Sequence, residues 1–81
     1  MFYVYLIQSI MRPEECYVGF KEDLKARFQD HNSGKSIHTN KFKPWKLVEY
    51  FAFSNLETAQ DFENYLKSGS GRAFLKRHFL K

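Results

Sequence analysis

The spacing of apolar positions divides the chain into segments with strand-like and helix-like periods. Residues 2–9 read FYVYLIQS and are almost continuously apolar, a pattern typical of a strand covered on both faces. Residues 11–15 hold a proline and three charged side chains and predict a hairpin loop, so residues 16–20 are expected to form the returning strand. Residues 47–53 predict a third strand, whose alternation is weak because the run is mostly apolar.

Two other segments follow the helical period. The first begins at Glu22 and is stopped by Asn-Ser-Gly at residues 32–34. Its stripe at i, i+3, i+4 and i+7 is Leu24, Arg27, Phe28 and His31. The stripe of the second is Ala59, Phe62, Glu63 and Leu66. Ser54 and Glu57 predict a capping box at the start of this second helix, and residues 68–71 predict its end.

The rest of the chain completes a small domain. Residues 35–44 are basic and predict a loop with room for one helical turn, and residues 72–81 predict a last short helix. A chain of 81 residues is long enough to form one hydrophobic core, and folding at this size buries roughly 60% of the surface of the unfolded chain. We therefore expect a single domain over residues 1–81.

Composition narrows the class of protein. The net charge of +4 and the pI near 9.3 favour polyanions, although such values are common among small proteins. Cys16 is the single cysteine and has no partner for an internal disulfide. No signal peptide or long apolar run precedes the first strand, so a cytoplasmic protein without a membrane segment is expected.

Candidate chemistry starts with two tyrosines on the predicted hairpin. Because strand residues alternate faces, Tyr5 and Tyr17 can point to the same side of the sheet if the two strands pair. Aromatic side chains in strands are usually there for packing, and Tyr can reach water with its hydroxyl. The two tyrosines therefore indicate a catalytic site only if the helices place further polar side chains on the same face of the sheet.

Three polar residues occupy helix stripes that are normally apolar: Arg27, His31 and Glu63. Taken singly, each has a structural explanation, such as an arginine that snorkels or a Glu63 paired with Lys67 at i+4. Taken together, and facing a sheet with two tyrosines, they predict a shared polar cleft, since a half-buried charge must find partners.

These residue types suit the cleavage of phosphodiester bonds. Glu63 can hold a hard divalent cation through oxygen, Arg27 can grip a phosphate, and a tyrosine or His31 can accept a proton from water. His31 alone would more often be a satisfied core or surface histidine. Zinc is not expected, because one cysteine and three scattered histidines show no ligand spacing.

At this point the chain resembles the GIY-YIG nuclease superfamily, in particular its small stand-alone bacterial members. Tyr3-Val4-Tyr5 stands for the first motif and Tyr17-Val18-Gly19 for the second. Arg27, the His31-Asn32 pair and Glu63 follow in the order of the family pattern, so the likeness spans nearly the whole chain.

The resemblance implies an α+β fold, in which a three-stranded antiparallel sheet is flanked by helices. It also implies a DNA endonuclease that depends on Mg²⁺ or Mn²⁺, with repair and recombination as candidate settings. The implied catalytic residues are Tyr5, Tyr17, Arg27, His31 and Glu63. Among them Glu63 would be the metal ligand, Arg27 the phosphate clamp and Tyr5 the proton acceptor, with Tyr17 and His31 in support.

The chain departs from the family pattern at four positions. Tyr3 replaces the first glycine of the name motif, and Phe20 stands where some repair nucleases carry a lysine. Lys21 stands where relatives have a hydroxyl N-cap, which removes the cap and adds a charge at the positive end of the helix dipole. Leu75 lies where larger members carry an asparagine. These departures put catalytic efficiency in question.

Basic residues are candidates for contacts with the nucleic-acid backbone, although each one singly is more often a solvated surface residue. They are Lys35, Lys41, Lys43, Lys46, Arg72, Lys76 and Arg77. Phe42 and Trp45 lie among them and suit base stacking, but an aromatic residue before a strand is more often a lid on the core.

Two rival functions stay open. The first is a nucleic-acid-binding module that keeps the scaffold with little or no catalysis. The second is a protein-interaction domain, in which Glu63 and Arg27 would form a structural salt bridge. The sequence leaves open whether RNA is accepted, what the oligomeric state is, and whether a partner protein confers specificity.

Overall fold

The computed structural model describes residues 1–36 and 39–80. Its elements are β1 (Phe2–Ser9), β2 (Cys16–Lys21), α1 (Leu24–Ser33), the short 3₁₀ helix η1 (Asn40–Phe42), β3 (Trp45–Phe53), α2 (Leu56–Lys67) and α3 (Gly69–His78). The predicted loop at residues 35–44 contains η1 as its one helical turn. Residues 37 and 38 of that loop, and residue 81 of the predicted last helix, lie outside the described residues.

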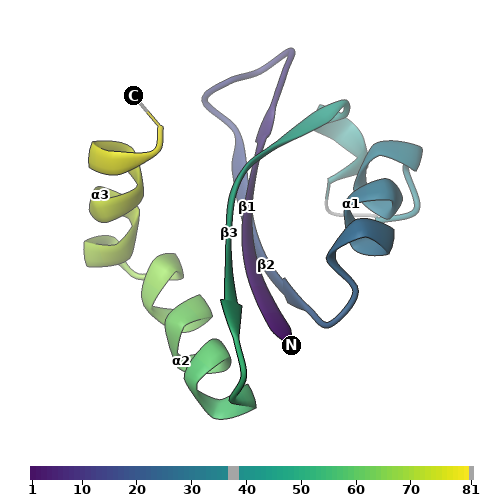
Figure 1. Ribbon diagram of the computed structural model, residues 1–81. Coiled ribbons are helices and arrows are strands. Elements are labelled where there is room, and N and C mark those ends of the chain that lie inside the picture. Colours follow the sequence, from purple (N-terminus) through teal and green to yellow (C-terminus); the bar gives the residue numbers. More distant parts are fainter. Residues whose placement is uncertain (37–38, 81) are drawn as a thin grey trace.

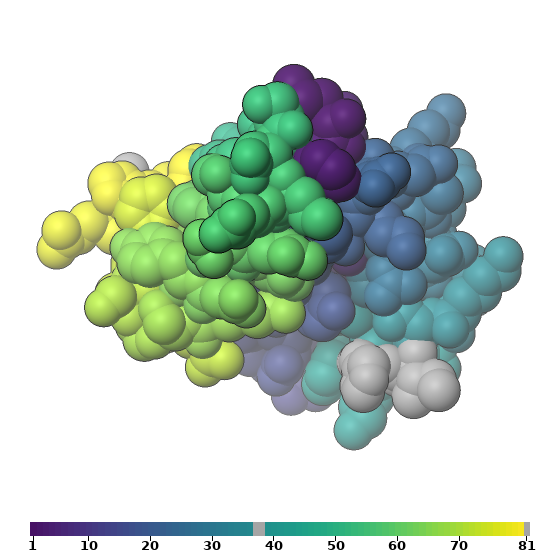
Figure 2. Space-filling model, turned by 90° about the horizontal axis from the view of Figure 1, so that it is seen from below, coloured from purple at the N-terminus to yellow at the C-terminus, as the bar shows by residue number. Residues whose placement is uncertain are grey.

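The three strands form one antiparallel sheet in the order β2-β1-β3, which confirms the α+β fold class. Helix α1 lies on one face of the sheet, and α2 and α3 lie on the other (Figure 1). Figure 2 shows this arrangement from below, with the green and yellow atoms of α2 and α3 on one side and the blue atoms of α1 on the other. No helix in the described part of the chain is long and apolar enough to cross a membrane.

The central strand β1 is covered on both faces, as its continuous apolar sequence predicts. Val4 and Leu6 are fully buried in the core beneath α2 and α3, together with Ala59, Leu66 and Leu75. Tyr5 and Ile7 belong to a second, smaller core that also contains Trp45 and is covered from the α1 side. The second core therefore holds one of the two tyrosines of the predicted site.

The helix starts differ from the sequence predictions at two caps. The N-cap of α2 is Asn55 rather than Ser54, since the Asn55 amide oxygen accepts a hydrogen bond from the Thr58 N–H at 2.9 Å. The N-cap of α1 is Asp23, whose carboxylate accepts from the Ala26 N–H at 3.0 Å. Helix α1 therefore has a capping side chain, and the expectation that Lys21 costs it one was wrong, because Lys21 ends β2.

Helix α2 ends at Lys67, as residues 68–71 predict, but α3 begins at Gly69, three residues before its predicted start, so residues 69–71 form its first turn. Ser68 makes this possible by capping α3, because its hydroxyl accepts from the Gly71 N–H at 3.2 Å. Gly71 lets the two helices meet closely: a Cβ there would lie 1.9 Å from the Tyr65 carbonyl oxygen and 2.5 Å from the Leu66 Cα. The glycine pattern that predicted a break is a tight helix junction.

The third strand begins at Trp45, two residues earlier than predicted. The side chain of Asn32 holds this start in place, since its amide oxygen accepts from the Trp45 N–H and its amide nitrogen donates to the Trp45 carbonyl at 3.0 Å. This pair of bonds ties the end of α1 to the start of β3.

Candidate active site

Tyr5 lies across the edge strand of the sheet because its partner there is a glycine. In the register of β1 and β2, Tyr5 faces Gly19. A Cβ added at Gly19 would lie 2.2 Å from the Tyr5 hydroxyl oxygen and 2.3 Å from its Cζ. The absence of a side chain at Gly19 therefore gives the phenol its path from the central strand toward the sheet edge.

A buried chain of hydrogen bonds starts at this phenol. The Tyr5 hydroxyl lies 2.9 Å from Nε2 of His31, and Nδ1 of His31 lies 2.6 Å from Oγ1 of Thr39. All three residues are at most 1% exposed. Helix α1 therefore presents His31 to the sheet with both ring nitrogens occupied.

Tyr17 and Arg27 complete the cluster on the same side. The ring of Tyr17 lies 5.1 Å from that of His31 and 6.4 Å from that of Tyr5, centroid to centroid. The Arg27 guanidinium lies within electrostatic range of the Tyr5 and Tyr17 hydroxyls, and it is half-buried like Tyr17. The two strands and α1 thus bring together four of the predicted site residues.

Burial controls the protonation of this cluster. Desolvation raises the pKa of Tyr5 to about 12, and the nearby Arg27 only partly opposes that rise. Desolvation also lowers the pKa of His31, and the positive charge of Arg27 acts in the same direction. At neutral pH the site therefore holds a neutral phenol beside a neutral imidazole.

Glu63 approaches the cluster from α2. Its charge contributes to the raised pKa of Tyr5, so the carboxylate lies within electrostatic range of the phenol. Its side chain is 19% exposed, and its Oε2 lies 3.0 Å from Nζ of Lys67. The i+4 pairing considered from the sequence is therefore present. An Arg27–Glu63 salt bridge is absent from the ion pairs of the described residues.

One part of the sequence interpretation needs correction. The shared polar cleft predicted from the sequence is only partly open to solvent, since Tyr5 is 1% exposed and His31 is fully buried. Tyr17, Arg27 and Glu63 are only half-buried, so they form the part of the cluster that solvent can reach. The phenol packs under Gly19 and the imidazole packs under α1, and this accounts for the difference.

The donor set for a divalent cation at this cluster is small. Among the described residues no group of three or more His, Cys, Asp or Glu side chains could hold a metal ion. Glu63 supplies one hard oxygen ligand, which fits Mg²⁺, an ion that usually keeps several waters and binds through one or two carboxylates plus phosphate. It does not fit zinc, which needs three or four protein ligands.

The basic candidates come from separate parts of the molecule, and all of them are exposed. Lys35, Lys41 and Lys43 lie between the end of α1 and the start of β3, Lys46 lies in the first residues of β3, and Arg72, Lys76 and Arg77 lie on α3. Arg72 and Lys76 line a groove of about 510 Å³ between the hairpin and the helices α2 and α3. Tyr17 and Lys67 line the same groove, so it adjoins the cluster, whereas Glu14 and Glu15 add acidic groups to its wall.

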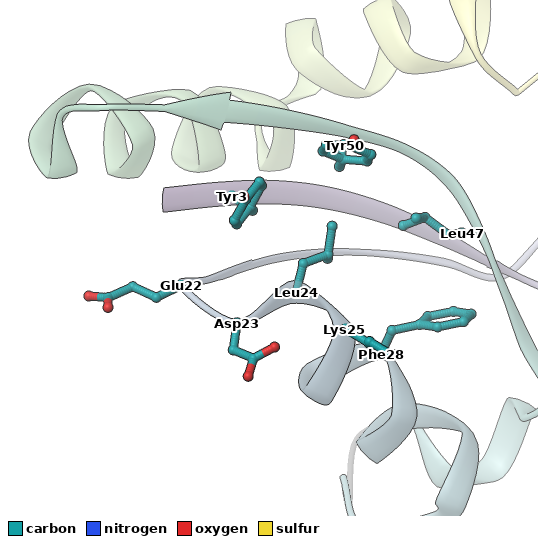
Figure 3. A pocket seen from close by; sticks show the side chains of 8 residues that line it. All are labelled: Tyr3, Glu22, Asp23, Leu24, Lys25, Phe28, Leu47 and Tyr50. Carbon is teal, nitrogen blue, oxygen red and sulfur yellow. The ribbon is translucent and has the colours of Figure 1, made fainter. Parts of the chain in front are cut away.

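A second cavity, of about 760 Å³, is shown in Figure 3. Apolar and aromatic side chains from α1, β1 and β3 line it, and none of the five predicted catalytic residues does. Glu22 and Asp23 stand at its helix end, where they disfavour a polyanion. This cavity is therefore not the site that the sequence predicts.

The two aromatic residues of the basic segment are packed into the second core. Trp45 is 4% exposed and donates its Nε1–H to the Thr39 carbonyl at 2.9 Å, so it is a lid on the core and has no free face for a base. Phe42 is half-buried against the same core, with Nζ of Lys41 at 5.9 Å from its ring centre.

Sequence reasoning missed Thr39 and Lys67 as neighbours of the catalytic candidates. Thr39 follows a loop without period, and no spacing rule relates it to His31, eight residues earlier. Lys67 was considered only as the ion-pair partner of Glu63, although its place one helical turn after Glu63 put it on the same face of α2. Gly19 was noticed only as part of a motif.

Comparison with known proteins agrees with this arrangement. Residues 1–77 match the model of the GIY-YIG catalytic domain. A UPF0213 protein of Clostridium perfringens is 35% identical over 83% of this chain and 71% of its own length. A UPF0213 protein of Streptococcus pyogenes serotype M3 is 29% identical over 88% of this chain and 76% of its own length.

One relative has a name that describes an activity. The structure-specific endonuclease subunit SLX1 homolog of Giardia intestinalis is 31% identical over 75% of this chain, which spans 18% of that protein. Together with the sheet, the flanking helices and the clustered tyrosines, these matches define the class as a nuclease, a hydrolase of phosphodiester bonds. The chain belongs to the GIY-YIG catalytic domain family.

Proposed function

We propose that the chain is a metal-dependent endonuclease that hydrolyses phosphodiester bonds in DNA, and that residues 1–81 act as one domain. The observation that carries the proposal is the 2.9 Å contact between the Tyr5 hydroxyl and Nε2 of His31, beside Arg27 and within electrostatic range of Glu63. A phenol, an imidazole, a guanidinium and a carboxylate at one sheet edge provide the groups that this reaction needs.

The proton route follows from the protonation states. Because its pKa is raised to about 12, Tyr5 does not act as a preformed phenolate. It accepts the proton of the attacking water while it gives its own proton to Nε2 of His31. The water oxygen bonds to phosphorus, the bond from phosphorus to the leaving sugar oxygen breaks, and that oxygen takes a proton from solvent.

The other residues bind and orient the phosphate. Arg27 is cationic and half-buried, so it meets the scissile phosphate at the accessible side of the cluster, where Tyr17 also lies. Glu63 would hold Mg²⁺ or Mn²⁺, and the bound ion would neutralise charge on the phosphate. Because one carboxylate already paired with Lys67 is a weak ligand set, metal affinity without DNA should be low.

The groove beside the cluster supports a path for the substrate. Lys67, Arg72 and Lys76 line it together with Tyr17, so a phosphate backbone lying there would reach the half-buried site residues. The relative named as a structure-specific endonuclease subunit motivates DNA of defined structure, such as branched DNA, as the first substrate to try. A role in repair or recombination and a cytoplasmic location are the setting that the sequence analysis suggests for this activity. The same name motivates a search for a partner that confers specificity.

The runner-up is a binding module on the same scaffold, and the burial of Tyr5 is the observation that favours it. A phenol and imidazole that are satisfied within the core can stabilise a fold without catalysis. The two functions differ in one measurable property, which is cleavage that requires the metal.

The test uses the whole chain with branched, single-stranded and duplex DNA, with Mg²⁺, with Mn²⁺ and with EDTA. We expect cleavage only with metal, and expect Glu63→Gln to abolish cleavage while DNA affinity stays within a few-fold of wild type. The matched control is Glu57→Gln, at the exposed first turn of the same helix, which should cleave normally. Full cleavage by Glu63→Gln would remove this carboxylate from the mechanism, and wild-type binding without cleavage would favour the binding module.

A further inference from the structure

Thr39 is a buried polar residue with one side-chain contact of consequence. It is 1% exposed, and its hydroxyl lies 2.6 Å from Nδ1 of His31. The other nitrogen of that ring faces the Tyr5 hydroxyl at 2.9 Å. The His31 imidazole therefore links the Thr39 hydroxyl to the Tyr5 phenol in one chain of hydrogen bonds.

The backbone of Thr39 is fixed from two sides. Its carbonyl accepts the Nε1–H of the buried Trp45 at 2.9 Å, and its N–H donates to the Ser36 carbonyl at 3.3 Å. Asn32, which follows His31 on α1, makes two hydrogen bonds to the backbone of Trp45 through its side chain. The imidazole and the threonine are thus both anchored to the start of β3, which fixes the geometry between them.

The two hydroxyls differ in acidity, and that difference selects the imidazole tautomer. A neutral imidazole has one N–H donor and one bare nitrogen acceptor, and the bond at one nitrogen decides the role of the other. A phenol is far more acidic than an aliphatic alcohol, so it is the better donor and the poorer acceptor. The favoured arrangement has the Tyr5 O–H donating to Nε2 and Nδ1–H donating to the Thr39 oxygen.

We propose that Thr39 is a positioning residue that holds His31 in the Nδ1–H tautomer, with the bare Nε2 aimed at the Tyr5 hydroxyl. The inference rests on the proposed function for its effect on catalysis, because only a bare Nε2 can accept the phenolic proton. Without the Thr39 hydroxyl, the Nδ1–H of His31 has no acceptor. The tautomer with the proton on Nε2 is then favoured, because its Nε2–H can donate to the Tyr5 oxygen. In that arrangement Tyr5 has lost its proton acceptor.

The test combines a spectroscopic and a kinetic measurement on Thr39→Val and Thr39→Ser. The ¹⁵N shifts of the His31 ring report the tautomer in the free protein, without metal or DNA. We expect the Nδ1–H form in wild type and in Thr39→Ser, which keeps the hydroxyl. In Thr39→Val we expect the Nε2–H form to become substantial.

In the kinetic arm Thr39→Val should lower kcat about 10–100-fold with an unchanged KM, by analogy with residues that orient metal-bound histidines, and Thr39→Ser should restore most of the rate. An Nε2–H tautomer in wild type would overturn the inference, even if Thr39→Val did not fold. So would a wild-type kcat in a folded Thr39→Val. A wild-type protein that shows the Nδ1–H tautomer but never cleaves DNA would refute the proposed function instead, while the positioning of His31 would stand.

Discussion

Tyr5 is held by its two neighbours, a glycine above the ring and a histidine at the hydroxyl. Loss of this hydroxyl should destabilise the fold, because Tyr5→Phe leaves the buried Nε2 of His31 without a partner, at a cost of about 1–3 kcal/mol. A slower reaction in Tyr5→Phe is therefore informative only at a temperature where the variant is folded.

The pH dependence of stability gives a prediction for this residue that does not involve activity. The folded-state pKa of Tyr5 is raised from 10.0 to about 12, so the neutral phenol stabilises the fold below pH 10 and this stabilisation is lost as the pH rises toward 12. A difference of about two pKa units corresponds to about 3 kcal/mol. In denaturant titrations between pH 8 and 11, Tyr5→Phe should lose less stability than wild type.

The control for that experiment is Tyr50→Phe, the same chemical change at a tyrosine that is 48% exposed on the neighbouring strand. Its pH profile should follow that of wild type. Parallel profiles for wild type and Tyr5→Phe would show that the phenol of Tyr5 is not the group responsible.

Prediction from the sequence worked best for site residues whose direction is fixed by a regular period. Tyr5 and Tyr17 come from paired strands and Arg27 and His31 from one helix stripe, so their closeness follows from secondary structure. Thr39 stands in a turn, where no period relates side-chain direction to position, and only the fold brings it to His31. The depth of burial was missed too, because it depends on how closely β2 and α1 cover β1.

At the scale of elements, the junction of α2 and α3 shows why glycine-rich segments are easily misread. Glycine commonly ends a helix, and residues 68–71 accordingly predict the end of the second helix, which the structure confirms, but not the start of a third helix within them. In the fold, Ser68 ends one helix and caps the next, and Gly71 allows backbone contact between them. Sequence alone does not distinguish a glycine needed for conformational freedom from one needed for close approach.

The two glycines of that junction provide a matched pair of variants. Gly71→Ala would place its Cβ 1.9 Å from the Tyr65 carbonyl oxygen, so the helices must separate, at a cost of about 1–3 kcal/mol for overpacking. Gly69→Ala meets nothing within 4 Å and adds a better helix former, so its stability should be unchanged or slightly higher. Urea unfolding followed by circular dichroism measures the free energy of unfolding of both variants. Equal values for the two would mean that the helix junction accommodates the Gly71→Ala side chain without loss of stability.

For the whole molecule, the order of elements and the α+β class could be predicted from apolar periods together with the family pattern. The position of α2 and α3 on the opposite face of the sheet from α1 could not be predicted (Figure 1). That separation bears on the proposed function, in which the carboxylate of Glu63 on α2 acts together with Tyr5 and His31 from the α1 side of the sheet. It also divides the basic residues, so that only some of them can lie near the site.

The division of basic residues leads to a prediction about DNA binding. Lys76 lines the groove that also contains Tyr17, so a phosphate contact there should be lost in Lys76→Gln. For duplex DNA each lost contact should weaken binding similarly for all sequences and reduce the slope of log K against log salt by about one. Titrations in EDTA at several salt concentrations measure affinity without cleavage.

Lys25→Gln is the matched control, since it removes the same charge from an exposed position on α1, beside the cavity with the acidic end. Because screening limits the effect of a distant charge to about a Debye length, this variant should keep nearly the wild-type slope. If both variants lowered the slope equally, the protein would be attracting DNA through its overall charge. A drop confined to Lys76→Gln would place the DNA backbone in the groove between the hairpin and α3, which Lys67, the ion-pair partner of Glu63, also lines.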